Sequence, residues 1–274
     1  MTATLLVTND DGVTSPALIP LVRALERIED VERVNTLVPD RERSWIAKAM
    51  TRFEDVTVAT PAAREGDPCI MTSSGTPADC ANLGIHSVFD TRPDLVVSGI
   101  NIGLNHGMAF VMGSGTVGAA AEGVIAGLPA IAFSIGVRGG HGTFTQYALS
   151  TEGRELWLRS AEVAADIVQG VLSQGLPVGV DLLNVNFPQE VSLDTPRVVT
   201  EVARLGYDAL FKAREESLYA VDYQGQTERR PSDAQTDLAA IDEGLVSITP
   251  LRLSRAAPID ADLREALREV LSRT

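Results

Sequence analysis

Short apolar runs alternate with helix-like segments over the first 190 residues, and this alternation limits the possible folds more than any other feature of the chain. The runs expected to be strands are the start of "LLVTNDDG" (5–12), then 33–39, 94–99, 130–135 and 181–188. The expected helices follow residue 15 and cover 115–128 and 151–175. Strands that alternate with helices predict an α/β fold, with a mostly parallel sheet covered by helices on both faces.

The stretch "LLVTNDDG" decides how this alternation begins. Asp-Gly after an apolar run is also the strongest short signal for a hairpin turn. The next residues have a helical pattern, however, because Ser15 can cap a helix and Pro16 suits the first helical position. Apolar residues then recur at spacings of three and four, at Leu18, Leu21, Val22, Leu25 and Ile28. We therefore predict a strand, a loop and a helix, which puts the two aspartates in a strand-to-helix loop.

The character of the sequence changes near residue 191. Strand-like stretches such as 198–205 and 217–224 alternate apolar and polar residues there. This pattern predicts an antiparallel extension instead of another strand–helix–strand unit.

The C-terminal part completes the expected organisation. A last strand is predicted at 245–251 and a closing helix at 260–273. The chain is thus expected to form two parts, a core over 1–190 and a β-hairpin extension over 191–274.

The charge of the chain excludes one class of function. The formal net charge is −14, and the only lysines are Lys48 and Lys212. A protein that binds nucleic-acid duplexes needs a basic face, so a duplex is not an expected partner. No apolar run of about 18 residues predicts a membrane span, and no basic-then-apolar leader precedes the first strand. The two cysteines, Cys69 and Cys80, lack metal-ligand spacing, and a cytoplasmic location is expected.

Polar residues follow three of the predicted parallel strands, at the point where each strand ends. They are Asn9, Asp10 and Asp11 after the first strand, Asp40, Arg41, Arg43 and Ser44 after the second, and Ser98, Asn101 and Asn105 after the third. The third loop leads to Ser114, Gly115 and Thr116, which begin a helix. Because ligands bind at the carboxyl ends of the strands in open α/β sheets, we expect these residues to converge on one site.

The residue types in this set favour a hard divalent cation beside an anion. Carboxylates, amide carbonyls and hydroxyls suit Mg²⁺, Mn²⁺ or Ca²⁺, whereas the His and Cys ligands that zinc prefers are lacking. The N–H groups at a helix N-terminus suit a phosphate, so the combination predicts phosphoryl chemistry. Taken singly, an Asp pair in a loop is commonly a turn and Ser-Gly-Thr before a helix is commonly a cap. The prediction therefore rests on their convergence.

Several segments, spread in order over nearly the whole chain, resemble those of one known family. They are "NDDG" (9–12), "PDRERS" (39–44), "SSGTPADC" (73–80), "PDLVVSGINIGLN" (93–105), "SGTVGAAAEG" (114–123), "LNVNFP" (183–188) and "TDLAAIDEGLVSITPL" (236–251). The chain resembles the stationary-phase survival protein SurE family of metal-dependent 5′(3′)-nucleotidases and phosphomonoesterases. The resemblance implies a Rossmann-like core with a protruding β-hairpin used in oligomerisation. It also implies a homodimer or homotetramer with exchanged C-terminal elements.

The resemblance further implies roles for particular residues. One divalent cation, Mg²⁺ or Mn²⁺ with Ca²⁺ as an alternative, is expected on Asp10, Asp11, Ser44 and Asn101. The residues expected to bind phosphate and substrate are Asn9, Asn105, Ser114, Gly115 and Thr116. The implied reaction releases a nucleoside and phosphate from a nucleoside 5′-monophosphate, and in some cases a 3′-monophosphate, by attack of a metal-activated water. Asp10 and Asp11 are the expected catalytic residues, and direct attack by an aspartate is the alternative to water.

The sequence departs from the family pattern in two places. Met108, Ala109 and Phe110 stand where acidic residues are expected, and Gly113 is an extra residue before Ser114. Bulky Trp45 follows Ser44, where the family has small residues. A large indole there can narrow the site or stack on a base. Both departures concern the choice of substrate more than metal binding, because all four metal positions are intact.

Two other functions remain as alternatives. One is a family member that, because its 106–113 loop is altered, binds metal or nucleotide without turnover. The other is a phosphorylation-regulated receiver domain, which also has an acidic pair after its first strand. A receiver would need a phospho-accepting aspartate after 94–99, where Ser98 and Gly99 stand. A dinucleotide-binding oxidoreductase fits less well, because no G-x-G-x-x-G follows the first strand.

Overall fold

The computed structural model describes residues 2–253 apart from 63, 137–146, 148–149, 223–226 and 231–234. The closing helix predicted at 260–273 therefore lies outside the described residues.

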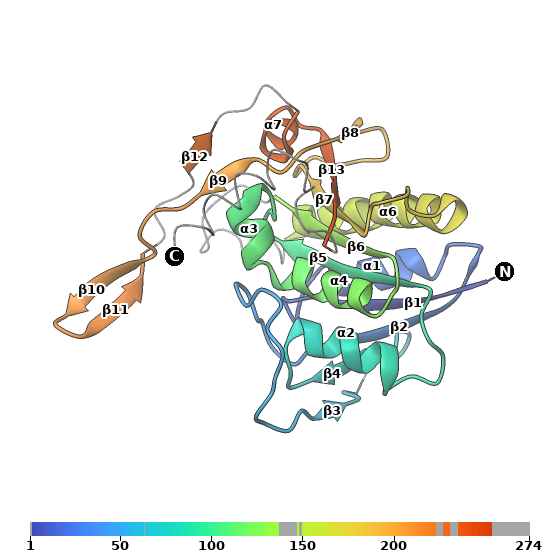
Figure 1. The fold of residues 1–274 in the computed structure, drawn as a ribbon. Coiled ribbons are helices and arrows are strands. Elements are labelled where there is room, and N and C mark those ends of the chain that lie inside the picture. Colours follow the sequence, from blue (N-terminus) through green and yellow to red (C-terminus); the bar gives the residue numbers. More distant parts are fainter. Residues whose placement is uncertain are drawn as a thin grey trace, which may run out of the picture.

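One nine-stranded sheet forms the centre of the molecule (Figure 1). Its strands, in order across the sheet, are β3 (Val58–Ala59), β4 (Met71–Ser73), β2 (Val31–Pro39), β1 (Ala3–Thr8), β5 (Leu95–Ile102), β6 (Ala130–Ile135), β7 (Leu182–Phe187), β13 (Val246–Leu251) and β8 (Arg197–Val199). The run from β4 to β7 is parallel throughout, while β3 and β13 pair antiparallel with β4 and β7. The mostly parallel α/β fold predicted from the alternation is confirmed.

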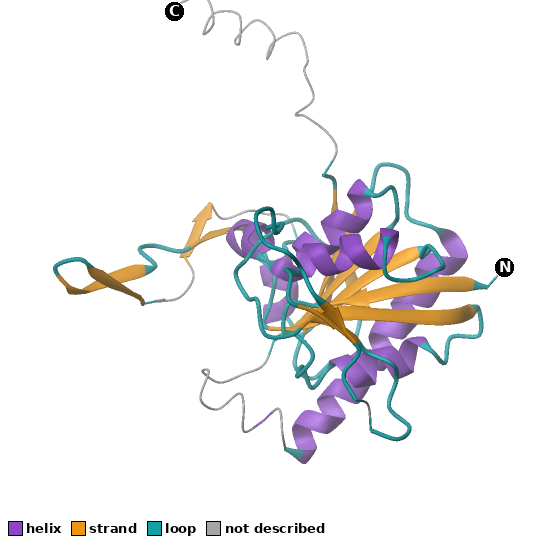
Figure 2. Cartoon of the chain, turned by 90° about the horizontal axis from the view of Figure 1, so that it is seen from below, coloured by secondary structure: helices purple, strands orange, loops and turns teal. Residues whose placement is uncertain are grey.

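Helices cover both faces of the sheet (Figure 2). Helices α1 (Leu18–Leu25) and α6 (Thr151–Gln174) share one apolar core with Leu5 and Val7 of β1. Helices α2 (Pro77–His86) and α4 (Gly115–Ile125) pack on the other face, where Leu6 points. Successive residues of a strand point to opposite faces, so the consecutive residues Leu5, Leu6 and Val7 of β1 are all apolar because both faces of the strand are buried.

The first helix differs from its prediction at both ends. Ser15 and Pro16 precede α1 in a turn, and the cap position is Ala17, which makes no side-chain cap bond. The helix also ends at Leu25, before Ile28. The apolar spacing was a sound guide to the buried face, but the turn that Leu18 N–H closes on the Ser15 carbonyl delays the start of the helix.

Three helices in the described part of the chain were not predicted. Helix α2 begins with a capping box, in which Thr76 accepts from the Asp79 N–H and the Asp79 carboxylate accepts from the Thr76 N–H. Helix α3 (Gly107–Gly113) occupies the segment expected to be a loop, and α7 (Asp237–Asp242) precedes β13. All three are short, and short helices depend on tertiary packing more than on their own sequence.

The antiparallel extension is present after β8. Strand β9 (Arg204–Gly206) pairs with β12 (Thr227–Arg230), and β10 (Phe211–Glu215) pairs with β11 (Leu218–Val221). The β10–β11 hairpin projects away from the body of the molecule (Figure 1). The division of the chain at residue 190 stays a prediction, since β8 and β13 return to the central sheet.

Within the described residues, no single helix has the length and apolarity to cross a membrane. The pair α3 and α4 meets those criteria only when both helices are taken together, and they are bent by 66° where they meet.

Candidate metal and phosphate site

Loops from three strands meet the start of α4 around Asp10 and Asp11. The Arg43 N–H, in the loop after β2, donates to the Asp10 carbonyl at 2.7 Å. The Ile102 N–H, at the end of β5, donates to Asp11 Oδ2 at 3.1 Å. The Thr116 N–H of α4 donates to Asp10 Oδ2 at 3.1 Å. The segments that carry the four predicted metal ligands therefore converge as the strand-end rule predicts.

A tight turn after β1 sets the direction of both aspartates. Asn9 accepts from the Gly12 N–H at 3.0 Å and donates through Nδ2 to the Gly12 carbonyl at 3.1 Å. Gly12 has a φ of 79°, and a Cβ at this position would lie 2.7 Å from the Arg41 carbonyl carbon. Both ends of the buried Asn9 amide are thus engaged within the loop. The predicted contact of Asn9 with substrate stays a prediction.

Asp10 is held by the first turn of α4. Thr116 Oγ1 donates to Asp10 Oδ1 at 2.6 Å, in addition to the Thr116 N–H bond. A Cβ on Gly115 would lie 2.8 Å from Asp10 Cβ, so the absence of a side chain allows this close approach. Ser114 caps the helix by accepting from the Val117 N–H at 3.0 Å. Ser114 Oγ and the N–H and Oγ1 of Thr116 therefore make hydrogen bonds within the protein. The phosphate contacts predicted for these two residues stay predictions.

Asp11 and Asn101 lie on the β5 side of the site. Asp11 is partly exposed, whereas Asp10 and Asn101 are buried. The Asn101 side chain donates through Nδ2 to the Gly103 carbonyl at 2.7 Å. Because this contact uses the amide nitrogen, the Asn101 oxygen Oδ1 is the atom that can serve as a cation ligand.

The charge of the two carboxylates is not balanced by any basic side chain that the structure describes. Burial raises the pKa of Asp10 above its usual range, against the hydrogen bonds from Thr116. Burial and then the charge of Asp10 raise the pKa of Asp11 well above its usual range. Glu42 raises both pKa values further. Among the residues that the structure describes, the ion pairs use other acids, and neither aspartate has a basic partner.

This electrostatic situation fits a divalent cation. A cation between two ionised carboxylates supplies the missing positive charge, and the oxygen donors nearby are those that Mg²⁺ and Mn²⁺ prefer. Over the described ranges, no three His, Cys, Asp or Glu side chains gather into a metal-binding group. A site here would therefore need the Ser and Asn oxygens that the sequence predicts as ligands, beside the two aspartates.

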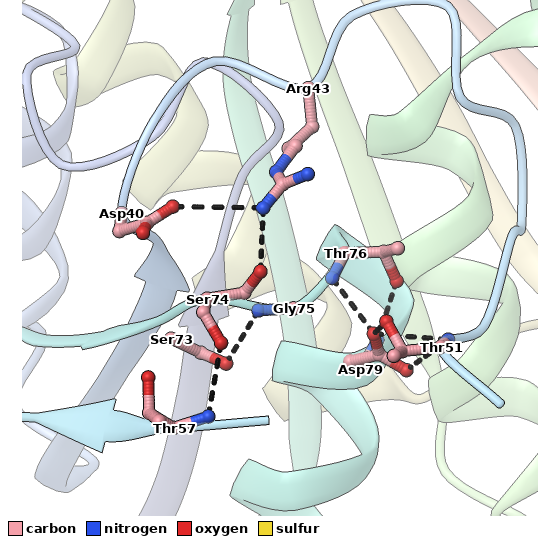
Figure 3. Close-up of polar contacts among 9 residues, drawn as sticks. All are labelled: Asp40, Arg43, Thr51, Thr57, Ser73, Ser74, Gly75, Thr76 and Asp79. Carbon is pink, nitrogen blue, oxygen red and sulfur yellow. Dashed lines mark hydrogen bonds and ion pairs between the residues drawn. The ribbon is translucent and has the colours of Figure 1, made fainter. Parts of the chain in front are cut away.

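Ser44 lies in an exposed loop that is anchored on both sides. Ser44 Oγ donates to Glu42 Oε1 at 2.8 Å. Figure 3 shows Arg43 between Asp40 and the Ser74 carbonyl, and Asp79 accepting from Thr51 further along the loop. The anchors fix the loop on the start of α2, next to the two aspartates.

A second set of contacts ties the same loop to α4 and to the end of α3. Lys48 Nζ lies 2.6 Å from Glu122 Oε2, and Asn82 donates to the other oxygen of that buried carboxylate at 2.8 Å. The Ala47 N–H donates to the Gly113 carbonyl at 2.9 Å. The ion pair of Lys48 with Glu122 therefore holds the loop against α4.

Asn105 belongs to a buried polar network behind the site. Its Nδ2 donates to Ser134 Oγ at 2.8 Å, and its N–H donates to Asn186 Oδ1 at 2.9 Å. Its carbonyl accepts from the side chains of Asn184 and Asn186. The network joins the ends of β6 and β7 to the loop after β5. The predicted phosphate contact of Asn105 stays a prediction.

Two features of the site were missed by the sequence analysis. Glu42 lies in the loop after β2, within the segment "PDRERS" (39–44) that the sequence analysis assigned to the site. A third acidic residue in that segment could therefore have been predicted to act on the two aspartates. The second feature is a contact among Trp45, Phe110 and Tyr207, with ring centroids 5.4 to 6.1 Å apart. Tyr207 comes from the extension, and nothing in the sequence links it to the other two rings.

Comparisons with known proteins agree with the resemblance seen in the sequence. A family profile described as "Survival protein SurE" matches residues 5–210. The chain is 36% identical over 263 residues to a protein from Methanocella arvoryzae named 5′-nucleotidase SurE, with 94% of each chain covered. It is 38% identical over 255 residues to the protein of the same name from Geobacter metallireducens, with 91% of each chain covered.

A solved structure is similar over almost the whole fold. The crystal structure of the SurE protein from Aquifex aeolicus is 30% identical and superposes with a TM-score of 0.73. The match covers 98% of this chain and 99% of the other. The similarity therefore includes the extension as well as the central sheet.

Proposed function

The chain belongs to the SurE survival protein family, and from this premise we propose that it is a metal-dependent 5′-nucleotidase. It hydrolyses nucleoside 5′-monophosphates to a nucleoside and phosphate. The observation that carries the proposal is the pair Asp10 and Asp11. Asp10 lies against the first turn of α4 and Asp11 against the end of β5, and neither has a basic partner among the described residues. Relatives named as 5′-nucleotidases, alike over more than nine-tenths of the chain, favour this function over a receiver domain or a binding protein without turnover.

We propose that Asp10, Asp11, Ser44 and Asn101 hold one Mg²⁺ or Mn²⁺ ion, with Ca²⁺ as the alternative. When bound, such a cation neutralises phosphate charge and lowers the pKa of water. Thr116 keeps Asp10 oriented through two hydrogen bonds. The N–H groups of Ser114, the N-cap of α4, and of Gly115, its first residue, provide donors for a phosphate at the positive end of the helix dipole.

The protein's own residues also handle protons. Asp10 and Asp11 have pKa values raised by burial, so each holds a proton more readily than an exposed carboxyl does. We infer that Asp10 orients the attacking water or accepts its proton. Attack by an aspartate itself is the alternative, and trapping a phosphorylated protein would distinguish the two.

The first experiment measures phosphate release from 5′- and 3′-nucleoside monophosphates and from p-nitrophenyl phosphate. Purified protein is stripped with EDTA and assayed without metal, then with Mg²⁺, Mn²⁺, Ca²⁺ or Zn²⁺. We expect no turnover without metal and restored turnover on 5′-monophosphates with Mg²⁺ or Mn²⁺. Binding of Mn²⁺ in calorimetry with no turnover of any ester would contradict the proposal and favour a binding protein.

A further inference from the structure

Three aromatic rings from distant parts of the chain gather beside the candidate site. Trp45 lies 5.7 Å from Phe110 in an edge-to-face arrangement and 5.4 Å from Tyr207 in a tilted one, as measured between ring centroids. Phe110 and Tyr207 complete the cluster at 6.1 Å. These are the separations at which aromatic rings attract one another.

Trp45 is the exposed member of the cluster. Its side chain is 52% exposed, whereas Phe110 and Tyr207 are partly buried. Trp45 also has a φ of 60°, in the left-handed region that a bulky residue rarely occupies. A strained backbone persists only where the surroundings hold it, and such positions cluster at ligand sites. Here the anchors on Ala47 and Lys48 hold the loop in place.

The cluster adjoins the place proposed for the phosphate. Trp45 directly follows Ser44, a proposed metal ligand, and Phe110 lies on α3, whose last residue adjoins Ser114. The bond between the Ala47 N–H and the Gly113 carbonyl ties the Trp45 loop to this junction. The loop that carries the exposed indole therefore borders the junction at which the phosphate is proposed to bind.

We propose that Trp45 is the stacking surface for the nucleobase of the substrate, supported from behind by Phe110 and Tyr207. This inference rests on the proposed nucleotidase activity and names its substrate class. Stacking strength grows with ring area, so purine 5′-monophosphates are preferred over pyrimidine 5′-monophosphates and over ribose 5-phosphate.

The surface next to the cluster is apolar as well. A shallow hollow of about 370 Å³ continues past Tyr207, and its other lining residues are Met108, Ala109, Met112, Gly113, Leu205 and Gly206. Methionine side chains adapt to flat ligands and contact aromatic rings favourably. Stacking and apolar contact do not read the edge of a base, so AMP and GMP are expected to be similar substrates.

The test compares specificity ratios between variants. We measure kcat/KM for AMP, GMP, CMP and ribose 5-phosphate with Mn²⁺ in the wild type, Trp45→Ala and Trp45→Phe. The ratio of AMP to ribose 5-phosphate is expected to fall about tenfold or more in Trp45→Ala, mainly through KM, and to recover in part in Trp45→Phe. Phe53→Ala is the matched control, because Phe53 is 89% exposed and lies outside the cluster. An unchanged ratio in Trp45→Ala would overturn the inference and leave the nucleotidase activity standing.

A binding measurement keeps the two proposals separate. The phosphonate analogue of AMP in which a CH₂ group replaces the ester oxygen, so that its phosphorus group cannot be hydrolysed off, is added to the Mn²⁺-loaded protein while tryptophan emission and heat are recorded. Trp157 is fully buried, so a change on binding is expected to come from Trp45 and to disappear in Trp45→Phe. Heat of binding without a change in emission would overturn the stacking role. The emission result tests the stacking role even if the protein turns over no ester. Absence of turnover would instead contradict the proposed nucleotidase function.

Discussion

At the scale of single residues, the site depends on two carboxylates whose charge no described basic side chain balances. Asp10 and Asp11 are neighbours in sequence, yet one is bound by α4 and the other by β5. Burial and mutual repulsion raise the pKa of both, which means that ionising them costs free energy in the metal-free protein. A bound cation removes that cost, so metal affinity and stability should be linked at these two residues.

Replacing either carboxylate should separate metal binding from folding. We expect Asp10→Asn and Asp11→Asn each to abolish tight Mn²⁺ binding in calorimetry and to reduce nucleotidase activity by at least a hundredfold. Metal-free Asp11→Asn should melt no lower than the wild type, because the amide removes a repulsive charge and can still accept from the Ile102 N–H. Asp67→Asn, at a surface ion pair with Arg23, is the control. Full turnover in either site variant would rule out the metal assignment.

The same raised pKa values predict how pH acts on the metal-free protein. A carboxyl whose pKa is higher in the folded state stabilises the fold at pH below its unfolded pKa of about 4, and that stability is lost as pH rises through the folded pKa. In EDTA, the melting temperature should therefore fall as pH rises from 4 toward neutral. The size of the fall should reflect the free energy lost when Asp10 and Asp11 ionise in the folded protein. The fall should be smaller in the double variant Asp10→Asn/Asp11→Asn. Equal slopes for the two proteins in a thermal scan would contradict the assignment of the shifts.

At the scale of elements, the docking of α4 on the loop after β1 forms the site. The contact needs Gly115, because a Cβ there would lie 2.8 Å from Asp10 Cβ and 3.2 Å from the Ile46 side chain. The neighbouring bonds from Thr116 then reach Asp10. The small residues at the start of this helix therefore have two roles: Ser114 caps the helix, and Gly115 lets the helix approach Asp10 closely.

Adding one methyl group at this contact should be costly. Gly115→Ala is expected to lose about 1–3 kcal/mol of unfolding free energy through overpacking and at least tenfold in activity, because α4 must move away from Asp10. Gly170→Ala in α6 is the matched control, since nothing lies within 4 Å of its added Cβ. That variant should be as stable as the wild type or gain about 0.4–1 kcal/mol. Urea denaturation and nucleotidase assays measure both effects, and a fully active Gly115→Ala protein would refute the close-contact argument.

Much of this level of structure could be predicted from local patterns. Strand β6 spans Ala130–Ile135, the predicted segment, because a run of apolar residues between turns is buried on both faces. Helix α3 was missed because its stability comes from elsewhere: the Met108 N–H donates to the Ala203 carbonyl, and Gly107 packs on Leu205 of β9. The bond from Thr116 to Asp10 joins residues 106 apart, and no local pattern predicts such a pairing. The convergence of these loops was thus predictable, whereas their hydrogen-bond partners were not, and the roles of the residues stay predictions.

At the scale of the whole molecule, the projecting hairpin exposes apolar side chains that nothing in the described chain covers. Phe211 pairs with Val221 and Ala213 with Tyr219 across β10 and β11, so these side chains share one face. Phe211, Tyr219 and Val221 are 62%, 61% and 72% exposed. An apolar face held away from the body of a protein indicates an interaction site. We propose, as the family resemblance implies, that it packs on a second copy of this chain in a homodimer or homotetramer.

Disrupting that face should change the mass of the particle without unfolding the chain. Light scattering should give the wild type a multiple of the 29.2 kDa chain mass, and Phe211→Asp/Tyr219→Ser should shift it to a smaller species. The melting of the core should change little at high dilution, because the substituted side chains are already exposed in one chain. Lys212→Ser is the control, since Lys212 pairs with Ala220 on the opposite face of the hairpin. A wild type that remains at the mass of one chain at micromolar concentration would contradict the proposal.

Assembly should also affect nucleotide binding. Strand β9, at the base of the hairpin, packs on α3, which carries Phe110 next to Trp45. Because assembly through the hairpin should hold this region in place, loss of the larger species should weaken nucleotide binding. Titrating the adenosine phosphonate against both species would then link assembly to the aromatic surface.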